Sequence, residues 1–301
     1  MAWAKEIKRK ITSIKNTAKI TKAMELISTV KMKKSQDLTL DKKDFVFEML
    51  KIFMKIDPYL SDYPLFSPWK WEKTLAVIIT SNKWLCWGYN VNVMKKVNSY
   101  IKETKEELEF ISVWKKWALF IARTWNKLLA DFSREFSDNI DILFTRKISV
   151  EMRKLFLLWW YKKVVVFYNH YVNTIVQKPQ ANIVLPIWRE EIKKYLIWIL
   201  WKDIDLEKEL SKETDISSYS LEPSIEEIAW EVIPVILDMM FFDIILSAKA
   251  SEHSSRMIAM KNAKDSANKI ASRLTLKYNN ARQALITREV SEITAWVESM
   301  K

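Results

Sequence analysis

The carboxy-terminal stretch SEHSSRMIAMKNAKDSANKIASRLTLKYNNARQALITREVSEITAWVESMK, residues 251–301, contains no proline and carries an apolar stripe. The members of the stripe recur at steps of three and four residues: Met260, Ala263, Ala267, Ile270, Leu274, Tyr278, Ala281 and Leu285. That spacing predicts one long helix with a single apolar face, flanked by charged residues that favour water. Because every second member of the stripe is small or slim, another helix can approach closely, and we expect this helix to pair with one.

The amino-terminal stretch is the expected partner. No proline occurs from Ala4 to about Asp57, and Ile7, Ile11, Ile14 and Ala18 step by four, three and four residues. We expect the apolar stripe then to drift to Ile20, Met24 and Ile27, as happens when the apolar spacing and the helix period differ slightly. All seven prolines lie between the two ends of the chain. The sequence therefore predicts a long antiparallel coiled coil of the terminal helices, up to roughly 80 to 100 Å at about 1.5 Å per residue.

The middle of the chain alternates short apolar runs with helical patterns. We expect strands at residues 74–81, 110–113, 140–144, 164–171 and 181–187, and helices that include one ending at Leu129 and one over residues 151–158. This alternation favours a small open α/β sheet of partly parallel order. The predicted class is α+β or α/β, with a coiled-coil helix over residues 1–57, an inserted Rossmann-like α/β domain over 58–224 and a second coiled-coil helix over 225–301.

The composition describes a soluble globular protein, with 49% hydrophobic and 29% charged residues. The single cysteine, Cys86, excludes an internal disulfide and offers no metal cluster. The longest apolar run, residues 228–246, is interrupted by charges and by Pro234, so we do not expect it to span a membrane. No apolar segment of the secretory type follows the start MAWAKEIKRK, which favours a cytoplasmic chain.

The net charge of +12 is distributed unevenly. Residues 1–35 contain ten lysines and arginines against only Glu6 and Glu25, a local excess of +8. Such a basic segment predicts an acidic partner surface, and nucleic acid, anionic lipid or an acidic protein would each satisfy it. No helix-turn-helix, RRM or zinc pattern accompanies the charge, so we favour a surface that faces a protein.

Glycine and tryptophan occur in unusual numbers. At a usual share of about 7%, a chain of this length would hold roughly 20 glycines, but it has one glycine, Gly88, and 15 tryptophans. The pairs Trp84 and Trp87, then Trp114 and Trp117, stand where turns are expected, and turns favour glycine because glycine tolerates positive φ. Our hypothesis is that many of these tryptophans are glycines in the native protein, encoded by UGA codons that its genome reads as glycine.

No combination of residues predicts catalytic chemistry. Read with glycines at Trp84 and Trp87, residues 80–90 superficially resemble a phosphate-binding loop, but neither of the common glycine spacings is present and a structural turn is the better interpretation. His170 and His253 are the only histidines and lie far apart without a carboxylate pair or a second cysteine at ligand spacing. We therefore expect no catalytic residue, no metal and no cofactor in this chain.

Three segments resemble the gamma subunit of F-type ATP synthase. They are AKEIKRKITSIKNTAKITKAMELISTVKMKKSQ near the amino terminus, SEHSSRMIAMKNAKDSANK with LTLKYNNARQALITREVSEIT near the carboxy terminus, and TSNKWLCWGYN, residues 80–90, in the middle. The last is similar to the family pattern TSDRGLCGGLN, so that Trp84 and Trp87 stand where the family has glycine, next to Gly88. The resemblance is specific at both ends and weak from about residue 131 to 222.

This resemblance implies a central rotor without catalytic activity of its own. The terminal helices would form the shaft inside a ring of alpha and beta subunits, and the inserted domain would bind the epsilon subunit and rest on the ring of c subunits. The chain would be a peripheral protein on the cytoplasmic side of the cell membrane, without nucleic acid and without inserting into the bilayer. Motif matching assigns contacts with the beta subunits to six residues: Lys22, Met24, Arg282, Gln283, Thr287 and Glu289.

Two other interpretations remain at this stage. A basic coiled-coil adaptor would bind nucleic acid or an anionic membrane surface, with an affinity that falls steeply as salt increases. An α/β enzyme would hold a ligand at residues 80–90, and the sequence supports this interpretation least.

Overall fold

The computed structural model describes residues 2–40, 43–60, 63–66, 72–81, 85–113, 127–132, 142–159, 161–187 and 224–300. The chain divides into two compact units, one made of residues 1–30 and 256–301 and the other of residues 31–255. Helices α1 (Ala2–Leu40) and α8 (Ile225–Ser299) contribute to both units. Helix α2 (Lys43–Ile56) and a short 3-10 helix (Asp57–Tyr59) follow α1.

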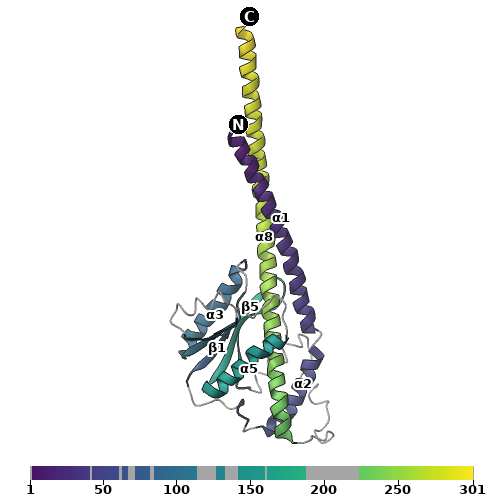
Figure 1. The fold of residues 1–301 in the computed structure, drawn as a ribbon, viewed down its shortest axis with the longest axis vertical. Coiled ribbons are helices and arrows are strands. Elements are labelled where there is room, and N and C mark those ends of the chain that lie inside the picture. The colour runs from purple at the N-terminus through teal and green to yellow at the C-terminus, as the bar shows by residue number, and fades with distance from the viewer. Residues whose placement is uncertain are drawn as a thin grey trace. The chain divides into compact units, whose positions relative to one another are not determined.

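In the first unit, α1 and α8 lie side by side and run antiparallel, as predicted (Figure 1). Each helix turns a row of buried or half-buried residues, spaced alternately by four and three, toward its partner. This spacing of 3.5 residues is that of a coiled-coil seam. The seam contains Ile7, Ile11, Ile14, Ala18, Thr21, Glu25 and Ser28 on α1, and Met260, Lys264, Ala267, Ala271, Leu274, Tyr278, Ala281 and Leu285 on α8.

The expected drift of the α1 stripe to Ile20, Met24 and Ile27 is wrong, because all three side chains are exposed. The seam keeps its regular step and continues through polar residues, of which Thr21 and Ser28 are buried. On α8 the same regular step buries Ala271 and leaves its neighbour Ile270 about half exposed, so Ile270 does not belong to the seam. The prediction selected residues because they are apolar, whereas the regular spacing of 3.5 residues decides which side chains face the partner helix.

An ion pair fixes the register of the two helices. The Glu25 carboxylate lies 2.8 Å from Lys264 Nζ, and the two residue numbers add to 289. Antiparallel helices rise equally per residue in opposite directions, so residues whose numbers add to about 289 lie at the same level. This places Ala18 opposite Ala271, both of them buried. Helix α8 continues about 12 residues, or about 18 Å, past the start of α1, and residues 286–300 are all exposed.

The second unit contains a five-stranded sheet in the order β3-β2-β1-β4-β5. Strands β1 (Thr74–Ile78), β2 (Leu108–Ser112), β3 (Lys127–Asp131) and β4 (Lys163–Tyr171) are parallel, and β5 (Gln177–Leu185) is antiparallel to β4. Every residue of β1 is buried, which is typical of a parallel strand covered on both faces. The sheet has helices to cover both faces, α3 (Trp87–Thr104) on one and α5 (Ile142–Trp159) with α8 on the other.

Alternate residues of β1 enter two separate cores. Ala76 and Ile78 pack in a cluster that contains Val93 and Val97 of α3. Leu75, Val77 and Ile79 belong to a larger cluster with side chains of two other helices, including Ile148 and Phe156 of α5 and Phe241 and Ile245 of α8. The large cluster also contains Phe53 and Ile56 of α2. The larger core ties the α/β domain to a central segment of α8.

Two expectations for the middle of the chain are wrong. Residues 142–144, expected to end a strand, begin helix α5, whose buried Thr145, Ile148, Met152 and Phe156 recur at steps of three and four. Residues 127–129, expected to end a helix, belong to strand β3, which pairs in parallel with β2. Short apolar runs do not distinguish helix from strand, and pairing across the sheet decides the outcome. The expected turns at Trp84, Trp114 and Trp117 lie outside the described residues.

Candidate functional site

The six residues predicted to contact other subunits all lie on exposed surface of the first unit. Lys22 and Met24 are on α1, and Arg282, Gln283, Thr287 and Glu289 are on α8. In the register set by the ion pair, Arg282 is level with residue 7 of α1, so it lies about 22 Å along the axis from Lys22. The structure therefore brings the four α8 residues together but keeps them well apart from the α1 pair. Thr287 donates its hydroxyl to the Gln283 carbonyl oxygen at 3.0 Å within the helix.

Exposed apolar side chains surround Met24. Ile20, Leu26, Ile27 and Val30 are each more than half exposed on α1. Over residues 20–30 the helix is thus polar toward its partner and apolar on its outer side, the reverse of a solvated coiled coil. Exposed apolar patches rimmed by polar groups mark contact surfaces. The signal was present in the sequence as the spacing of Ile20, Met24 and Ile27, but the pattern was interpreted as part of the seam.

A second apolar stripe runs along the end of α8. Its members step by four and three residues and are about half exposed or more: Ile286, Val290, Ile293, Val297 and Met300. This stripe lies almost entirely beyond the level at which α1 begins, so α1 does not cover it. A regular apolar stripe without a partner in its own unit fits a surface that another protein covers.

The first unit also holds nearly all of the excess charge. Residues 1–30 and 256–301 contain 16 lysines and arginines against 6 aspartates and glutamates, an excess of +10 out of the +12 of the whole chain. Within residues 1–30, Glu6 is paired with Lys10 and Glu25 with Lys264, so both acidic side chains of this segment are already neutralised. The remaining cations make the paired helices a strongly basic surface.

The motif of residues 80–90 ties the end of β1 to the start of α3. Asn90 accepts from the Ser81 backbone N–H at 2.9 Å and donates to the Ser81 hydroxyl at 2.8 Å. Trp87 and Gly88 are the first two residues of α3 rather than part of the turn, and Cys86 before them is buried. Among the described residues only Lys105 has a positive φ, so neither position requires the backbone freedom of glycine. The described contacts of this motif join β1 to α3.

The histidines are placed for packing rather than for catalysis. Burial, reinforced by the nearby charge of Lys178, lowers the pKa of His170 to about 4, so this ring is neutral near pH 7. Its Nδ1 lies 3.0 Å from the Ser247 hydroxyl. His253 is buried in α8. Over the part of the chain that the structure describes, no three side chains of the His, Cys, Asp and Glu types come together to hold a metal.

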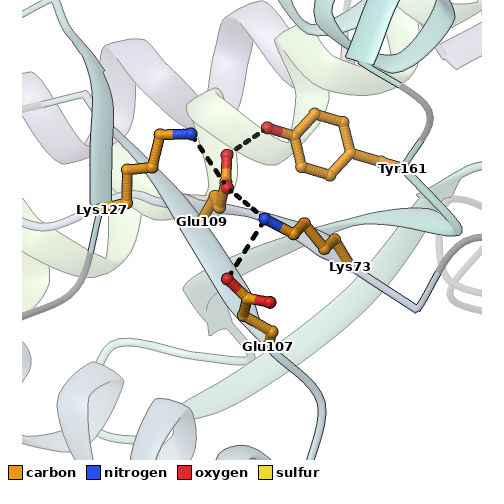
Figure 2. Close-up of polar contacts among 5 residues, drawn as sticks. All are labelled: Lys73, Glu107, Glu109, Lys127 and Tyr161. Atoms are coloured by element: carbon orange, nitrogen blue, oxygen red, sulfur yellow. Dashed lines mark hydrogen bonds and ion pairs between the residues drawn. The ribbon is translucent and has the colours of Figure 1, made fainter.

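A cluster of charged residues and one tyrosine lies at the amino-terminal ends of the parallel strands (Figure 2). The buried carboxylate of Glu109 accepts hydrogen bonds from Tyr161 at 2.5 Å and from Lys73 and Lys127 at 3.1 Å each. Burial alone would raise the pKa of Glu109, but these three donors outweigh it and lower that pKa. Burial and the same carboxylate raise the pKa of Tyr161. These bonds link the amino-terminal ends of strands β1, β2, β3 and β4, so the cluster stabilises the sheet.

None of the described helices combines the length and the apolar character that a bilayer crossing requires. The fully buried part of α8, residues 240–254, contains four acidic, basic or histidine side chains: Asp243, Lys249, Glu252 and His253.

Comparison with known proteins covers almost the whole chain. A family model described as ATP synthase matches residues 3–300. The ATP synthase gamma chain of Methylacidiphilum infernorum (isolate V4) is 32% identical over 304 residues, which cover 98% of each chain. That of Roseiflexus sp. (strain RS-1) is 31% identical over 307 residues, covering 98% of this chain and 97% of the relative.

Solved structures support the same fold. A chain from the central stalk and c-ring of the Tetrahymena thermophila mitochondrial ATP synthase superposes with a TM-score of 0.57 at 22% identity, covering 81% of this chain and 99% of that one. A chain from the Euglena gracilis mitochondrial ATP synthase gives a TM-score of 0.61 at 16% identity and covers 99% and 95%. With the family match over residues 3–300 and gamma chains more than 30% identical over its length, this protein belongs to the ATP synthase gamma chain family.

Proposed function

We propose that the chain is the central-stalk rotor subunit of an F-type ATP synthase, without a catalytic site of its own. It would couple ion flow through the c-ring to the conformational cycle of the catalytic beta subunits. The observation that carries this proposal is the antiparallel pair of helices whose basic surface and free apolar end have no partner within their unit. The family membership of the chain supports the same role.

The helix pair suits a shaft for a physical reason. Torsional work requires a long, continuously hydrogen-bonded element, and two helices packed along a seam resist twisting better than one helix alone. The shaft must also leave each angular position after reaching it. Exposed polar contacts are worth only about 0 to 1 kcal/mol each, so they favour particular angles without trapping the rotor.

The proposed contacts with beta subunits are Lys22, Met24, Arg282, Gln283, Thr287 and Glu289. The excess of +10 on this unit supports acidic loops as their partners, because complementary charge steers and orients an interface. The apolar side chains around Met24 and along the end of α8 would lie against apolar surface of the alpha and beta ring. Arginine can bind a carboxylate through two parallel hydrogen bonds, which gives the Arg282 contact a preferred direction.

The α/β domain would bind the epsilon subunit and rest on the c-ring. We propose that it is Rossmann-like, because four parallel strands carry helices on both faces, and that it occupies residues 58–224 between coiled-coil helices at residues 1–57 and 225–301. The whole chain would then lie at the cytoplasmic side of the cell membrane as a peripheral protein.

Reconstitution tests the proposed function. The full chain is coexpressed with the alpha, beta and epsilon subunits of its own organism, and copurification in a fixed ratio, with ATP hydrolysis that requires this chain, is expected. Arg282→Ala should lower ATP synthesis driven by an ion gradient more than it lowers the amount of assembled complex. Loss of assembly alone would contradict a coupling role for Arg282, and failure of the unmodified chain to copurify would reject the rotor.

One alternative keeps a specific observation in its favour, the basic surface of the first unit. An adaptor for nucleic acid or an anionic membrane would bind DNA or charged vesicles at micromolar concentration or below, with a steep dependence on salt. The rotor predicts no such binding once the alpha and beta subunits cover the helices. Binding of DNA and of anionic vesicles, measured with the purified complex and with the free chain, therefore distinguishes the two functions.

We also propose that many of the tryptophans are glycines in the native protein. Tryptophan is usually well buried, yet all four tryptophan side chains that the structure describes, Trp3, Trp87, Trp230 and Trp296, are more than half exposed. Peptide mass spectrometry of the native protein tests the proposal at Trp84 and Trp87. Glycine masses are expected there, and indole masses would reject it.

A further inference from the structure

Helix α8 is buried around its whole circumference over one segment. The fifteen residues from Met240 to Ser254 are here called the collar segment. All of them are buried, over about four turns of helix. A helix at a protein surface normally exposes one side. The collar segment belongs entirely to the unit of residues 31–255, and the unit of the paired helices begins just after it at Arg256. Other parts of the same unit, the α/β domain and α2 among them, therefore surround α8 at this place.

Two serines of the collar segment bond to the hairpin formed by β4 and β5. Ser247 and Ser254 are seven residues apart and so share one face of α8. The Ser247 hydroxyl accepts from the Tyr171 backbone N–H at 3.1 Å and lies 3.0 Å from His170 Nδ1. The Ser254 hydroxyl donates to the Thr174 carbonyl oxygen and accepts from Gln177 at 3.3 Å.

A further bond comes from another element of the domain. The hydroxyl of Tyr89 in α3 donates to the Ala248 carbonyl oxygen of α8 at 3.2 Å. The collar segment is thus bonded both to α3 and to the β4–β5 hairpin, on top of its packing in the large apolar core. Bonds from two separate elements restrain the helix against rotation and against sliding.

We propose that Ser247 and Ser254 form a rotational lock between the α/β domain and the collar segment of α8. The inference rests on the proposed rotor function and identifies where torque passes from the domain into α8. Turning α8 by 30° about its own axis moves each Cα by about 1.2 Å, and the serine oxygens farther. Hydrogen bonds weaken steeply when their distances and angles change by this much. The two serines therefore add a directional restraint to the resistance of the packed core.

The same helix supplies a matched control. Ser251 lies between the two serines and is completely buried, but its hydroxyl has no hydrogen-bond partner among the described residues. Ser251→Ala removes an oxygen from the collar segment without removing a bond to the domain. Any effect of shortening a buried side chain is therefore measured separately from the loss of the lock.

The test compares loaded and unloaded rotation in the whole ATP synthase reconstituted in vesicles. In the double variant Ser247→Ala with Ser254→Ala, we expect gradient-driven ATP synthesis and ATP-driven ion pumping to fall at least threefold. ATP hydrolysis by the detached complex of alpha, beta and this chain, where the rotor turns without load, should stay within twofold of the unmodified protein. Ser251→Ala should leave all three rates unchanged, and Ser247→Thr with Ser254→Thr should restore coupling by restoring both hydroxyls.

Three results would overturn the lock. They are full coupling in the double alanine variant, an equal loss in Ser251→Ala, and an equal fall of loaded and unloaded rates, which would indicate a purely structural role. Failure of the unmodified chain to assemble with alpha and beta subunits would instead reject the rotor function, so the two failures are distinguishable.

Discussion

The register of the helix pair can be tested by placing a disulfide across it. In a Cys86→Ala background, Ala18→Cys and Ala271→Cys introduce two thiols at buried seam positions whose numbers add to 289. Their axial offset is therefore close to zero. A disulfide requires Cα atoms less than about 7 Å apart, a separation that small residues at the same level of a seam can reach.

The control pair shifts one cysteine by about two turns. Ala18→Cys with Ala263→Cys adds to 281, eight residues from the register sum, which at about 1.5 Å per residue is an offset of about 12 Å. That offset exceeds the reach of a disulfide. If the helices slipped by one heptad, residue 264 would lie level with Ala18. Cross-linking of the control pair would then indicate this alternative register, because residue 263 is next to residue 264.

The assay is electrophoresis of the oxidised full chain with and without reductant. We expect the pair at 18 and 271 to form an internal disulfide within minutes of mild oxidation, and the pair at 18 and 263 to remain reduced under the same conditions. Cross-linking of the control pair to an equal extent, or no cross-linking of the pair at 18 and 271, would refute the register derived from Glu25 and Lys264.

Three further outcomes follow from the α/β domain and α8. Glu109→Gln should lower the free energy of unfolding at pH 7 by about 1.5–3 kcal/mol. Because folding lowers the pKa of Glu109, the stabilisation by this carboxylate is present above about pH 4.5 and is lost as the pH falls through the lowered pKa. Urea titrations of the variant and the parent should therefore converge as the pH falls. Phe241→Ala should cost about 3–5 kcal/mol in the same titration, because the ring is fully buried in the large core. Glu252→Gln should cost about 3–5 kcal/mol, because it removes the negative charge of a buried ion pair in which Lys249 Nζ lies 3.0 Å from the carboxylate. Glu292→Gln breaks an exposed pair on the same helix and should change stability little.

The pairing of the two ends was predictable because the residues of a coiled-coil seam recur at steps of three and four within each helix. Its phase was not, because the seam of α1 continues through Thr21, Glu25 and Ser28, which no apolar pattern reveals. These residues are tolerated there because Glu25 finds Lys264 on the other helix, 239 residues later in the chain. A contact between distant segments leaves no trace in the periodicity of either one.

The sheet was predictable in its strongest strands and not at its edge. Strands β1 and β4 are buried apolar runs, and both were expected close to their observed positions. Strand β3 is only half-buried, and its identity depends on pairing with β2 rather than on its own residues. The contacts of the collar-segment serines were not predictable either. The sequence does not show whether a serine in a helix contacts solvent, its own backbone or a neighbouring strand.

The end of α8 that projects past the start of α1 has a consequence for biogenesis. Helical turns with no tertiary support fray readily, since most helical stability in proteins comes from packing. Before any partner arrives, these turns would open and close while presenting Ile286, Val290 and Ile293 to the surrounding solution. Synthesised alone, the chain should be prone to self-association and to proteolytic trimming from this end, and it should gain resistance to both as soon as its partners enclose it.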